Sequence, residues 1–354
     1  MKILIATGGT GGHIFPAIET AKTLKARGHK VSFAGCLGQA ADKISALDFP
    51  CVSFFAHGLV DRSFLGWMRF GRVMAQAIFR SFGLIRQLSP DKIIGFGGYG
   101  AFPVVMAGVL MGRPVVIHEQ NVVPGKANAL LAKMAHKVAI SFEASRQYFS
   151  PSKAVWTGCP CHQQAEVVRL EGIKAMGLDE NKKTIMLLGG SQGSKRLNEV
   201  FFELMQELSA SGFQAIHMTG QADFALYEKR YRQLNLPVKT CAFINHMDQA
   251  YAASDMVVSR SGAASVTELG LLGIAAVLVP YPFAAGHQKF NAQVLADRKA
   301  AIIIEQKDLT KASLKEALMG LWASNPSREN ILNKTKGLFQ KDAALQLALV
   351  IEGL

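Results

Sequence analysis

The sequence lacks the cysteine pattern of a disulfide framework. Its 354 residues contain five cysteines, an odd number, and no two of them form a CxxC pair. This argues against a disulfide-stapled secreted protein and favours reduced thiols in the cytosol. Cys159-Pro160-Cys161-His162 is similar to a metal-binding pattern, but no second ligand cluster accompanies it. No metal site is therefore predicted.

The sequence also lacks a long, unbroken apolar run. The apolar stretch near the N-terminus, residues 3–6, is too short for a signal peptide, so we expect a cytosolic protein. Two longer stretches without charge, residues 93–112 and 269–283, are interrupted by glycine and proline. Because these residues break a spanning helix, we predict a buried strand with a neighbouring helix in each stretch instead.

Acidic residues are absent between Arg62 and Pro90, where five arginines alternate with aromatic and aliphatic residues. Residues 1–160 carry a net charge of +11, whereas residues 161–354 carry only +2. A basic, aromatic helix fits an anionic membrane surface, although a core helix with solvated arginines is the open alternative. No nucleic-acid partner is expected. The predicted membrane-facing residues are Arg69, Arg72, Phe79, Arg80 and Phe82.

The composition that is present favours an α/β protein of two domains. The hydrophobic fraction is 49%, and 33 glycines suit many tight strand–helix junctions. An apolar strand, a glycine loop and a helix follow one another near the N-terminus and again at residues 182–195. We therefore predict two facing Rossmann-like domains with parallel sheets, spanning residues 1–160 and 161–339. A C-terminal helix at about residues 340–354 is expected to pack back on the first domain.

The first glycine loop, Gly8-Gly9-Thr10-Gly11-Gly12-His13, has the character of an anion-binding loop. It lies between a predicted strand over 2–7 and a predicted helix from Phe15. Free N–H groups of a first helical turn favour an anionic ligand. The spacing Gly-x-Gly-x-x-Gly and the acidic residue after the second strand are both missing, so NAD binding is not predicted.

Further polar clusters follow predicted strands. In the first domain these are Gly97-Gly98-Tyr99 and His118-Glu119-Gln120-Asn121, and in the second domain Gly189–Gly193, Arg260–Glu268 and the segment that contains Gln288. Parallel sheets bind ligands at the carboxyl ends of their strands. We therefore expect these clusters to form the site.

The motifs in this order resemble the MurG family over essentially the whole chain. The matching segments are Gly8–His13 with Phe15-Pro16, Gly97–Tyr99, His118–Asn121, Gly189–Gly193, Phe243-Ile244, Arg260–Glu268 and Gln288–Asn291. The resemblance implies the GT-B architecture, with the active site in a cleft between the domains. It also implies transfer of N-acetylglucosamine from UDP-GlcNAc to an undecaprenyl-linked muramyl-pentapeptide (lipid I to lipid II) in peptidoglycan synthesis, by a peripheral enzyme on the cytoplasmic face of the inner membrane.

The resemblance assigns site residues by matching position. Ile244 would hold uracil through its backbone, Glu268 the ribose hydroxyls, and Ser191 with the Ala263–Ala264 turn the diphosphate. Thr10, Asn121 and Gln288 would orient the sugar. Further donor-binding residues are Gly11, Gly12, Gln192, Arg260, Ser265, Val266 and Thr267, and acceptor-binding residues are Gly8, Gly9, Gly97, Gly98 and Tyr99. The sequence departs from the family at His162, where an arginine that touches the donor is expected, and at Ala101, which replaces a serine.

The expected chemistry is a single displacement with inversion. His13 is the predicted base, with a pKa near 7, and Glu119 is the rival base or a group that orients the acceptor. No Asp-x-Asp triplet is present to hold a metal, so no cofactor is expected. Two other functions remain open: a UDP-GlcNAc epimerase of the same two-domain plan, and a non-catalytic nucleotide-sugar-binding protein at the membrane.

Overall fold

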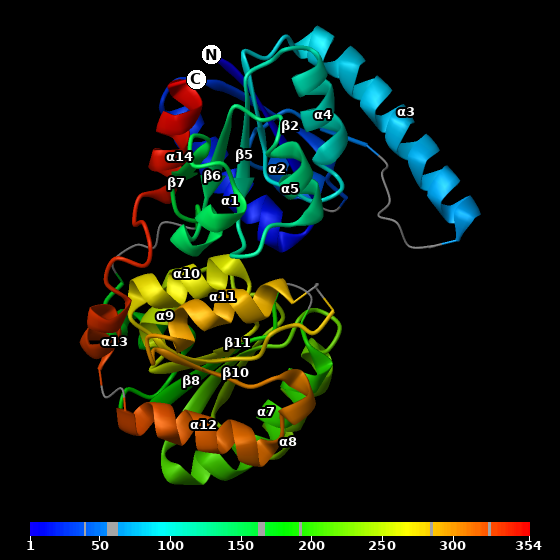
Figure 1. Ribbon diagram of the computed structural model, residues 1–354. Helices are drawn as coiled ribbons and strands as arrows, with labels where there is room; N and C mark the ends of the chain where they lie inside the picture. Colours follow the sequence, from blue (N-terminus) through cyan, green and yellow to red (C-terminus); the bar gives the residue numbers. More distant parts are fainter. Residues whose placement is uncertain (39, 55–62, 162–166, 191–192, 284–285, 325–326) are drawn as a thin grey trace. The chain divides into compact units, whose positions relative to one another are not determined.

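The computed structural model describes residues 1–38, 40–54, 63–161, 167–190, 193–283, 286–324 and 327–354 (Figure 1). The chain divides into two units, Met1–His162 with Phe339–Leu354, and Gln163–Leu338. These boundaries lie within two residues of those expected from the sequence. No helix of the described residues is long and apolar enough to cross a membrane.

The first unit is built on a seven-stranded sheet of order β3-β2-β1-β4-β5-β6-β7, and every neighbouring pair is parallel. The sequence predicted β1, as the strand over residues 2–7, and a buried strand in the stretch 93–112, which overlaps β4, but it did not predict the three-residue β3. The strands are β1 (Lys2–Gly8), β2 (Lys30–Cys36), β3 (Cys51–Ser53), β4 (Lys92–Gly95), β5 (Val115–Glu119), β6 (Lys137–Ile140) and β7 (Ala154–Trp156). The helices are α1 (Gly11–Ala26), α2 (Ala40–Ser45), α3 (Phe64–Leu88), α4 (Phe102–Leu110), α5 (Lys126–Leu131), η1 (Glu143–Tyr148) and α14 (Ala343–Glu352).

Strand β1 shows how the two faces of this sheet are covered. Successive side chains of a strand point to opposite faces. Ile3 and Ile5 belong to one core cluster, formed with side chains of α1, α2 and α14, whereas Leu4 and Ala6 belong to another, formed with side chains of α3, α4 and α5. Burial on both faces explains why β1 reads as one continuous apolar run.

Helix α14 is held to the first unit by polar contacts as well as by packing. Glu352 accepts two hydrogen bonds of 2.7 Å from the Arg27 guanidinium and lies 2.7 Å from His29 Nε2. These partners lower the pKa of Glu352 to about 2, and the hydrogen bond from Arg27 makes the largest contribution. Lys92 Nζ donates to the carbonyls of Ile351 and Glu352 at 2.8 Å, so the end of the chain is fixed beside the amino-terminal end of β4.

The second unit repeats the same topology. Its six-stranded sheet has the order β10-β9-β8-β11-β12-β13, with parallel pairs throughout. The strands are β8 (Lys183–Leu188), β9 (Phe213–Met218), β10 (Val238–Cys241), β11 (Met256–Ser259), β12 (Ala275–Leu278) and β13 (Ala301–Ile303). The helices are α6 (Arg169–Met176), α7 (Lys195–Leu208), η2 (Ser209–Ser211), α8 (Phe224–Gln233), α9 (Met247–Ala253), α10 (Ala263–Leu272), α11 (His287–Ala296), η3 (Gln306–Asp308), α12 (Lys311–Ser324) and α13 (Arg328–Thr335).

Each sheet has a point where the strand order reverses direction. In the first unit β1 lies between β2 and β4, and in the second β8 lies between β9 and β11. Doubly wound sheets bind ligands outside the carboxyl ends of the strands at such switch points. The glycine loops after β1 and β8 both begin there.

Candidate active site

His13 lies in the first turn of a helix and not in the loop before it. Helix α1 begins at Gly11, four residues earlier than predicted, and Thr10 is its N-cap. The Thr10 carbonyl accepts hydrogen bonds of 3.0 Å from the N–H groups of His13 and Ile14. Glycine and proline both disfavour a helix interior, which is why the sequence predicted a later start.

The His13 ring is held against the glycine loop that follows β4. Its Nδ1 lies 2.7 Å from Thr10 Oγ1, so the two atoms share a hydrogen bond. A Cβ on Gly98 would lie 3.4 Å from His13 Cε1, and Gly98 has φ +77°. Glycine at this position therefore serves both the left-handed backbone and the close approach of the ring.

Burial lowers the pKa of His13 to about 4, below the value near 7 expected from the sequence. The loss of surrounding water disfavours the charged imidazolium. The ring is therefore neutral at neutral pH, the form that a base requires. In the tautomer that donates from Nδ1 to Thr10 Oγ1, Nε2 keeps its lone pair and can accept a proton.

Glu119 does not have the geometry of a base. Its carboxylate is buried and accepts four hydrogen bonds: from Asn121 N (2.8 Å), Asn121 Nδ2 (3.2 Å), Gly125 N (3.0 Å) and Asn128 Nδ2 (2.9 Å). Burial raises its pKa, and these donors oppose that rise. Both oxygens accept hydrogen bonds from the chain's own 121–128 segment, and Glu119 holds Asn121 in place. This arrangement favours a positioning role over that of the rival base, which stays a prediction.

The sequence missed Asn128, which joins the two loops of the first unit. Its Nδ2 donates to the carbonyl of His118 at 3.1 Å as well as to Glu119. A Cβ on Gly97 would lie 2.9 Å from the same Nδ2, so the Gly97 backbone (φ +85°) rests directly on the Asn128 amide. An asparagine followed by the apolar residues Ala129–Leu131 in the short helix α5 is the signal that could have identified it.

His118 and Gln120 are interior residues that support the site. His118 Nε2 lies 3.1 Å from the carbonyl oxygen of Gly158 and donates to it, so Nδ1 accepts from Gln120 Nε2 at 3.1 Å. Gln120 Nε2 also donates to the carbonyl of Phe96. Of the four polar residues predicted as a cluster, only Asn121 is partly exposed, while the other three are buried.

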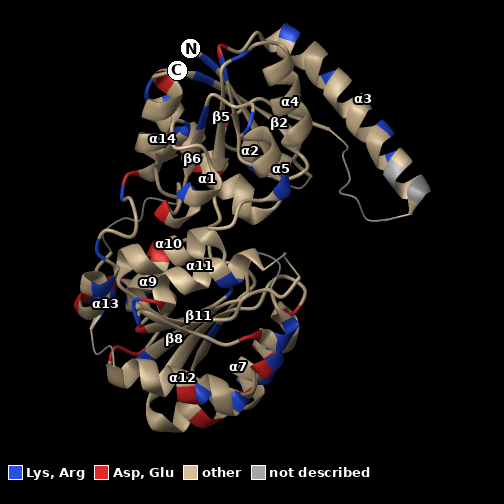
Figure 2. Ribbon diagram, in the orientation of Figure 1, with Lys and Arg blue, Asp and Glu red and all other residues tan. Residues whose placement is uncertain are grey.

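Tyr99 connects the glycine loop to the basic helix α3. Its ring is 48% exposed and meets the Phe70 ring edge-on, with centroids 6.3 Å apart. Arg69, Arg72 and Arg80 are exposed on α3, and Phe79 is 79% exposed. Figure 2 shows basic residues along α3 with no acidic residue among them.

One of the five residues predicted for the membrane-facing side of α3 does not lie on an open surface. Phe82 is partly buried and packs against the core cluster of Leu4 and Ala6. The carboxyl-terminal half of α3 lies beside α4, whereas its amino-terminal end extends away from the sheet (Figure 1). The helix therefore buries one side of its later turns and presents its arginines on the other.

In the second unit, the loop after β8 is shaped by glycines. Gly190 and Gly193 have φ of +90° and +75°, and a Cβ on Gly193 would lie 2.1 Å from the Thr219 carbonyl oxygen. No side chain fits there. Ser191 and Gln192, both predicted to bind the donor, lie outside the described residues, as does His162.

Arg260 joins three loops at the carboxyl edge of this sheet. Its Nη2 donates to Ser194 Oγ at 2.8 Å and to Gln306 Oε1 at 2.6 Å, while Nη1 donates to the carbonyls of Val279 and Pro280. Both terminal nitrogens of the guanidinium therefore donate to acceptors within the protein. Arg260 fixes the loops that carry the other residues, and its predicted part in donor binding stays a prediction.

Helix α10 presents its amino terminus at the same edge. Gly262 is the N-cap, and the N–H groups of Ala263, Ala264 and Ser265 lie in the first turn, where they have no partner within the helix. Val266 and Thr267 have buried side chains, and Val266 N already donates to the Gly262 carbonyl. Both residues lie within the helix, and the buried Thr267 Oγ1 has no hydrogen-bond partner among the described residues.

Glu268, Gln288 and Ile244 are the remaining predicted donor-binding residues of this unit. Glu268 is partly exposed, and its Oε2 accepts a 2.8 Å hydrogen bond from the Tyr251 hydroxyl. Gln288 Oε1 accepts from Tyr281 N at 2.9 Å, and the Ile244 side chain is buried. The nearby Asn291, buried on α11, donates to the Ser261 carbonyl and ties α11 to the turn before α10.

Comparisons with known proteins agree with this architecture. Residues 3–140 match the glycosyltransferase family 28 N-terminal domain, and residues 184–347 match the glycosyltransferase family 28 C-terminal domain. The solved structure of MurG from Acinetobacter baumannii is 30% identical, covers 100% of this chain and 99% of its own, and superposes with a TM-score of 0.77. The calicheamicin glycosyltransferase CalG4, 14% identical with a TM-score of 0.73, shares the fold. Two Rossmann-like units with these domains define a glycosyltransferase of the GT-B type.

Sequence relatives narrow the class further. A protein from Bacillus subtilis named "UDP-N-acetylglucosamine--N-acetylmuramyl-(pentapeptide) pyrophosphoryl-undecaprenol N-acetylglucosamine transferase" is 34% identical over 370 residues, which cover 100% of this chain and 99% of the relative. A protein of the same name from Thermodesulfovibrio yellowstonii is 37% identical over 316 residues, covering 87% of this chain and 86% of the relative. The chain belongs to the MurG family of glycosyltransferases.

Proposed function

We propose that this protein transfers N-acetylglucosamine from UDP-GlcNAc to a lipid-linked N-acetylmuramyl-pentapeptide. The observation that carries the proposal is the match, along the whole chain, to relatives that bear this activity in their names. The reaction joins the acceptor hydroxyl oxygen to the anomeric carbon, and the bond from that carbon to the UDP oxygen breaks. The hydroxyl proton passes to a base, and UDP leaves.

The first unit offers the base for this step. Neutral His13 lies beside Thr10 and the Gly97–Tyr99 loop, in the unit that the family assigns to the acceptor. The glycines around it let an acceptor approach the backbone closely. The loop that carries Asn121 is fixed by Glu119 and Asn128, so that its side chain is positioned before substrate arrives.

The second unit offers groups suited to a nucleotide sugar. The N–H groups at the start of α10 and the loop after β8 favour the diphosphate, whose negative charge grows as UDP leaves. The half-buried Glu268 carboxylate can accept hydrogen bonds from the two ribose hydroxyls. The backbone of Ile244 would pair with uracil, and Gln288 would orient the sugar.

The direct test is an assay with radiolabelled UDP-GlcNAc in the presence and absence of lipid-linked muramyl-pentapeptide. We expect UDP release and labelled lipid only when the acceptor is present. Epimerised donor without acceptor would instead support a UDP-GlcNAc epimerase, and unchanged donor under both conditions would support a non-catalytic binding protein.

We further propose that no metal is needed, since fixed N–H groups can neutralise the leaving diphosphate. Activity in excess EDTA is expected to stay within about twofold of that in untreated protein. Adding Mg²⁺ or Mn²⁺ back after chelation is the control. Loss of activity on chelation, restored by either metal, would contradict this proposal.

We also propose that α3 binds the surface of an anionic membrane, with its arginines toward lipid headgroups and Phe79 toward the acyl boundary. Each basic residue near such a surface contributes about 1 kcal/mol. Arg72→Ala should therefore weaken sedimentation with phosphatidylglycerol vesicles about fivefold, while Lys229→Ala in the second unit, an exposed control, leaves it unchanged. Equal sedimentation of the two variants would contradict this role of α3.

A further inference from the structure

The second unit contains a cavity at the edge of its sheet opposite to the candidate donor site. It has a volume of about 370 Å³. Lys183 begins β8, and Asp255 and Gly273 lie just before β11 and β12, so the cavity opens at the amino-terminal ends of the strands. Ala275 of β12 also lines it, and its other walls come from α6, α9, α12 and α13 with Arg169, Ala252, Trp322, Ser327, Arg328 and Ile331. The proposed transfer reaction uses none of these residues.

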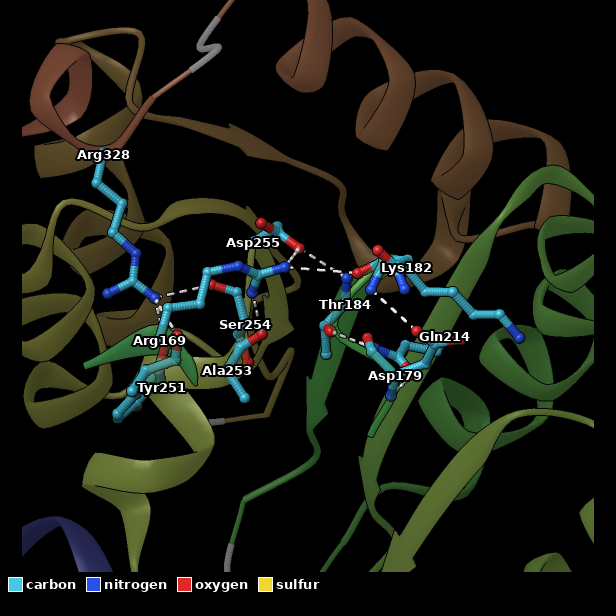
Figure 3. A network of polar contacts seen from close by, with 12 residues as sticks. Arg169, Asp179, Lys182, Thr184, Gln214, Tyr251, Ala253, Ser254, Asp255 and Arg328 are labelled. Atoms are coloured by element: carbon cyan, nitrogen blue, oxygen red, sulfur yellow. Dashed lines mark hydrogen bonds and ion pairs between the residues drawn. The ribbon is translucent and has the colours of Figure 1, made fainter. Parts of the chain in front are cut away.

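The lining of this cavity carries an excess of positive charge. Arg169, Lys183 and Arg328 are cationic, and Asp255 is the carboxylate among the lining residues. Asp255 Oδ2 accepts from Arg169 at 3.1 Å and from Thr184 N at 2.7 Å (Figure 3). The carboxylate pairs with Arg169 and also attracts the Arg328 guanidinium electrostatically, but no ion pair joins Lys183 or Arg328 to an acid within the described chain.

Arg328 uses only part of its guanidinium for the fold. Its Nη2 donates to the carbonyls of Tyr251, Ala252 and Ser254 at the end of α9 (Figure 3). Its Nη1 and Nε make no hydrogen bond among the residues that the structure describes. A planar guanidinium with two N–H-bearing nitrogens unused is suited to a paired contact with the oxygens of an oxyanion.

Lys183 and Trp322 also line the cavity. The Lys183 ammonium lies 5.1 Å from the centroid of the Trp322 ring. This cation–π contact holds the ammonium at the cavity while leaving its hydrogen-bond donors available. The cavity thus combines two unpaired cations with apolar surface from Trp322 and Ile331, in a volume within the range of small-molecule sites.

We infer that this cavity binds the phosphate group of a small phosphate ester. Arg328 and Lys183 would bind the phosphate oxygens, and Trp322 would contact the organic part. Arg169 stays paired with Asp255, so the net charge of the site is that of Lys183 and Arg328. The inference is independent of the proposed transfer activity.

The indole N–H of Trp322 gives a signal specific to this cavity, which separates it from phosphate bound at the donor loops. We propose to titrate the ¹⁵N-labelled full-length protein with inorganic phosphate and with glycerol 3-phosphate, following the Trp322 indole resonance by NMR after assignment with Trp322→Phe. Trp156, whose indole donates to the Ser141 carbonyl in the first unit, serves as the internal reference. A saturable shift of Trp322 with an unmoved Trp156 is expected for both probes.

Variants of Lys183 and Arg328 test whether these two cations cause the shift of the Trp322 resonance. A charge-assisted hydrogen bond contributes enough for Lys183→Ala to weaken the apparent affinity about tenfold. Arg328→Lys keeps the positive charge but loses the paired N–H groups of the guanidinium. Its phosphate affinity should lie between those of wild type and Arg328→Gln. The exposed-lysine control Lys229→Ala should bind as wild type does. Lys183 is the exposed first residue of β8, so its replacement leaves the core intact.

Two results would overturn the inference. One is a Trp322 resonance that does not move with either probe, and the other is an equal shift in Lys183→Ala and Lys229→Ala. If Lys183→Ala also reduces sedimentation with phosphatidylglycerol vesicles, the phosphate comes from a lipid headgroup; unchanged sedimentation assigns it to a free phosphate ester. Both of these outcomes support phosphate binding at the cavity.

Discussion

His13→Ala is expected to lower kcat about 10²–10⁴-fold, because a positioned base contributes a factor of this size. The ring is half-buried in the first turn of α1, so the variant should fold and bind UDP-GlcNAc with unchanged affinity. The measurement is steady-state kinetics together with donor binding by calorimetry. His136→Ala, which changes an exposed histidine of the same unit, is the matched control and should stay near wild type.

The pH profile gives this prediction a second readout. Only the neutral ring can take a proton, and burial lowers the pKa of His13 to about 4. As the pH falls through about 4, the ring becomes protonated and the base is lost, whereas between pH 5 and 8 it stays neutral. The acid limb of kcat/KM should therefore lie near pH 4 in wild type and be absent in His13→Ala. Full activity of His13→Ala, or an acid limb centred near pH 7, would contradict the assignment.

Glu119→Ala is expected to have a large effect on folding as well as on activity. It leaves four hydrogen-bond donors of the 121–128 segment without their acceptor. Each buried unsatisfied group costs roughly 1–3 kcal/mol, so the free energy of unfolding should fall by several kcal/mol. Denaturant unfolding of the full-length protein measures this loss, with the exposed Glu143→Gln as control.

Glu119→Gln separates positioning from proton transfer. The amide keeps one acceptor oxygen but points an N–H₂ group at donors, so it should be less stable than wild type yet more stable than Glu119→Ala. Its residual activity should keep the wild-type pH profile, since Glu119 acts through Asn121. A fully stable Glu119→Gln that has lost activity more than a hundredfold would instead make Glu119 the base.

The fold could be predicted from sequence because its signals are local and repeated. The strands are mostly short apolar runs, and β1 and β8 lead directly into glycines. The glycine loops after β1 and β8 lie at strand ends, where parallel sheets bind ligands. Strand β3 was missed because Cys51-Val52-Ser53 is largely exposed and forms no apolar run. The early start of α1 was missed because Gly11, Gly12 and Pro16 have low helix propensity, which the tertiary structure overrides.

The roles of individual polar residues could not be predicted, because they depend on partners brought together by folding. Glu119 and Arg260 were assigned to substrates, but their hydrogen-bonding groups are committed to loops of the protein. Asn128 was missed for the same reason, as its contacts lie across two loops. The lowered pKa of His13 arises from burial, which composition and spacing do not report.

The configuration of the transferred sugar tests the central claim most directly. UDP-GlcNAc carries an α-linked sugar, and a single displacement by the acceptor hydroxyl inverts the anomeric carbon. NMR of the lipid-linked product made from ¹³C-labelled donor should therefore show one β-linked N-acetylglucosamine for each UDP released. An α-linked product, or UDP released without labelled GlcNAc in the lipid, would contradict the account.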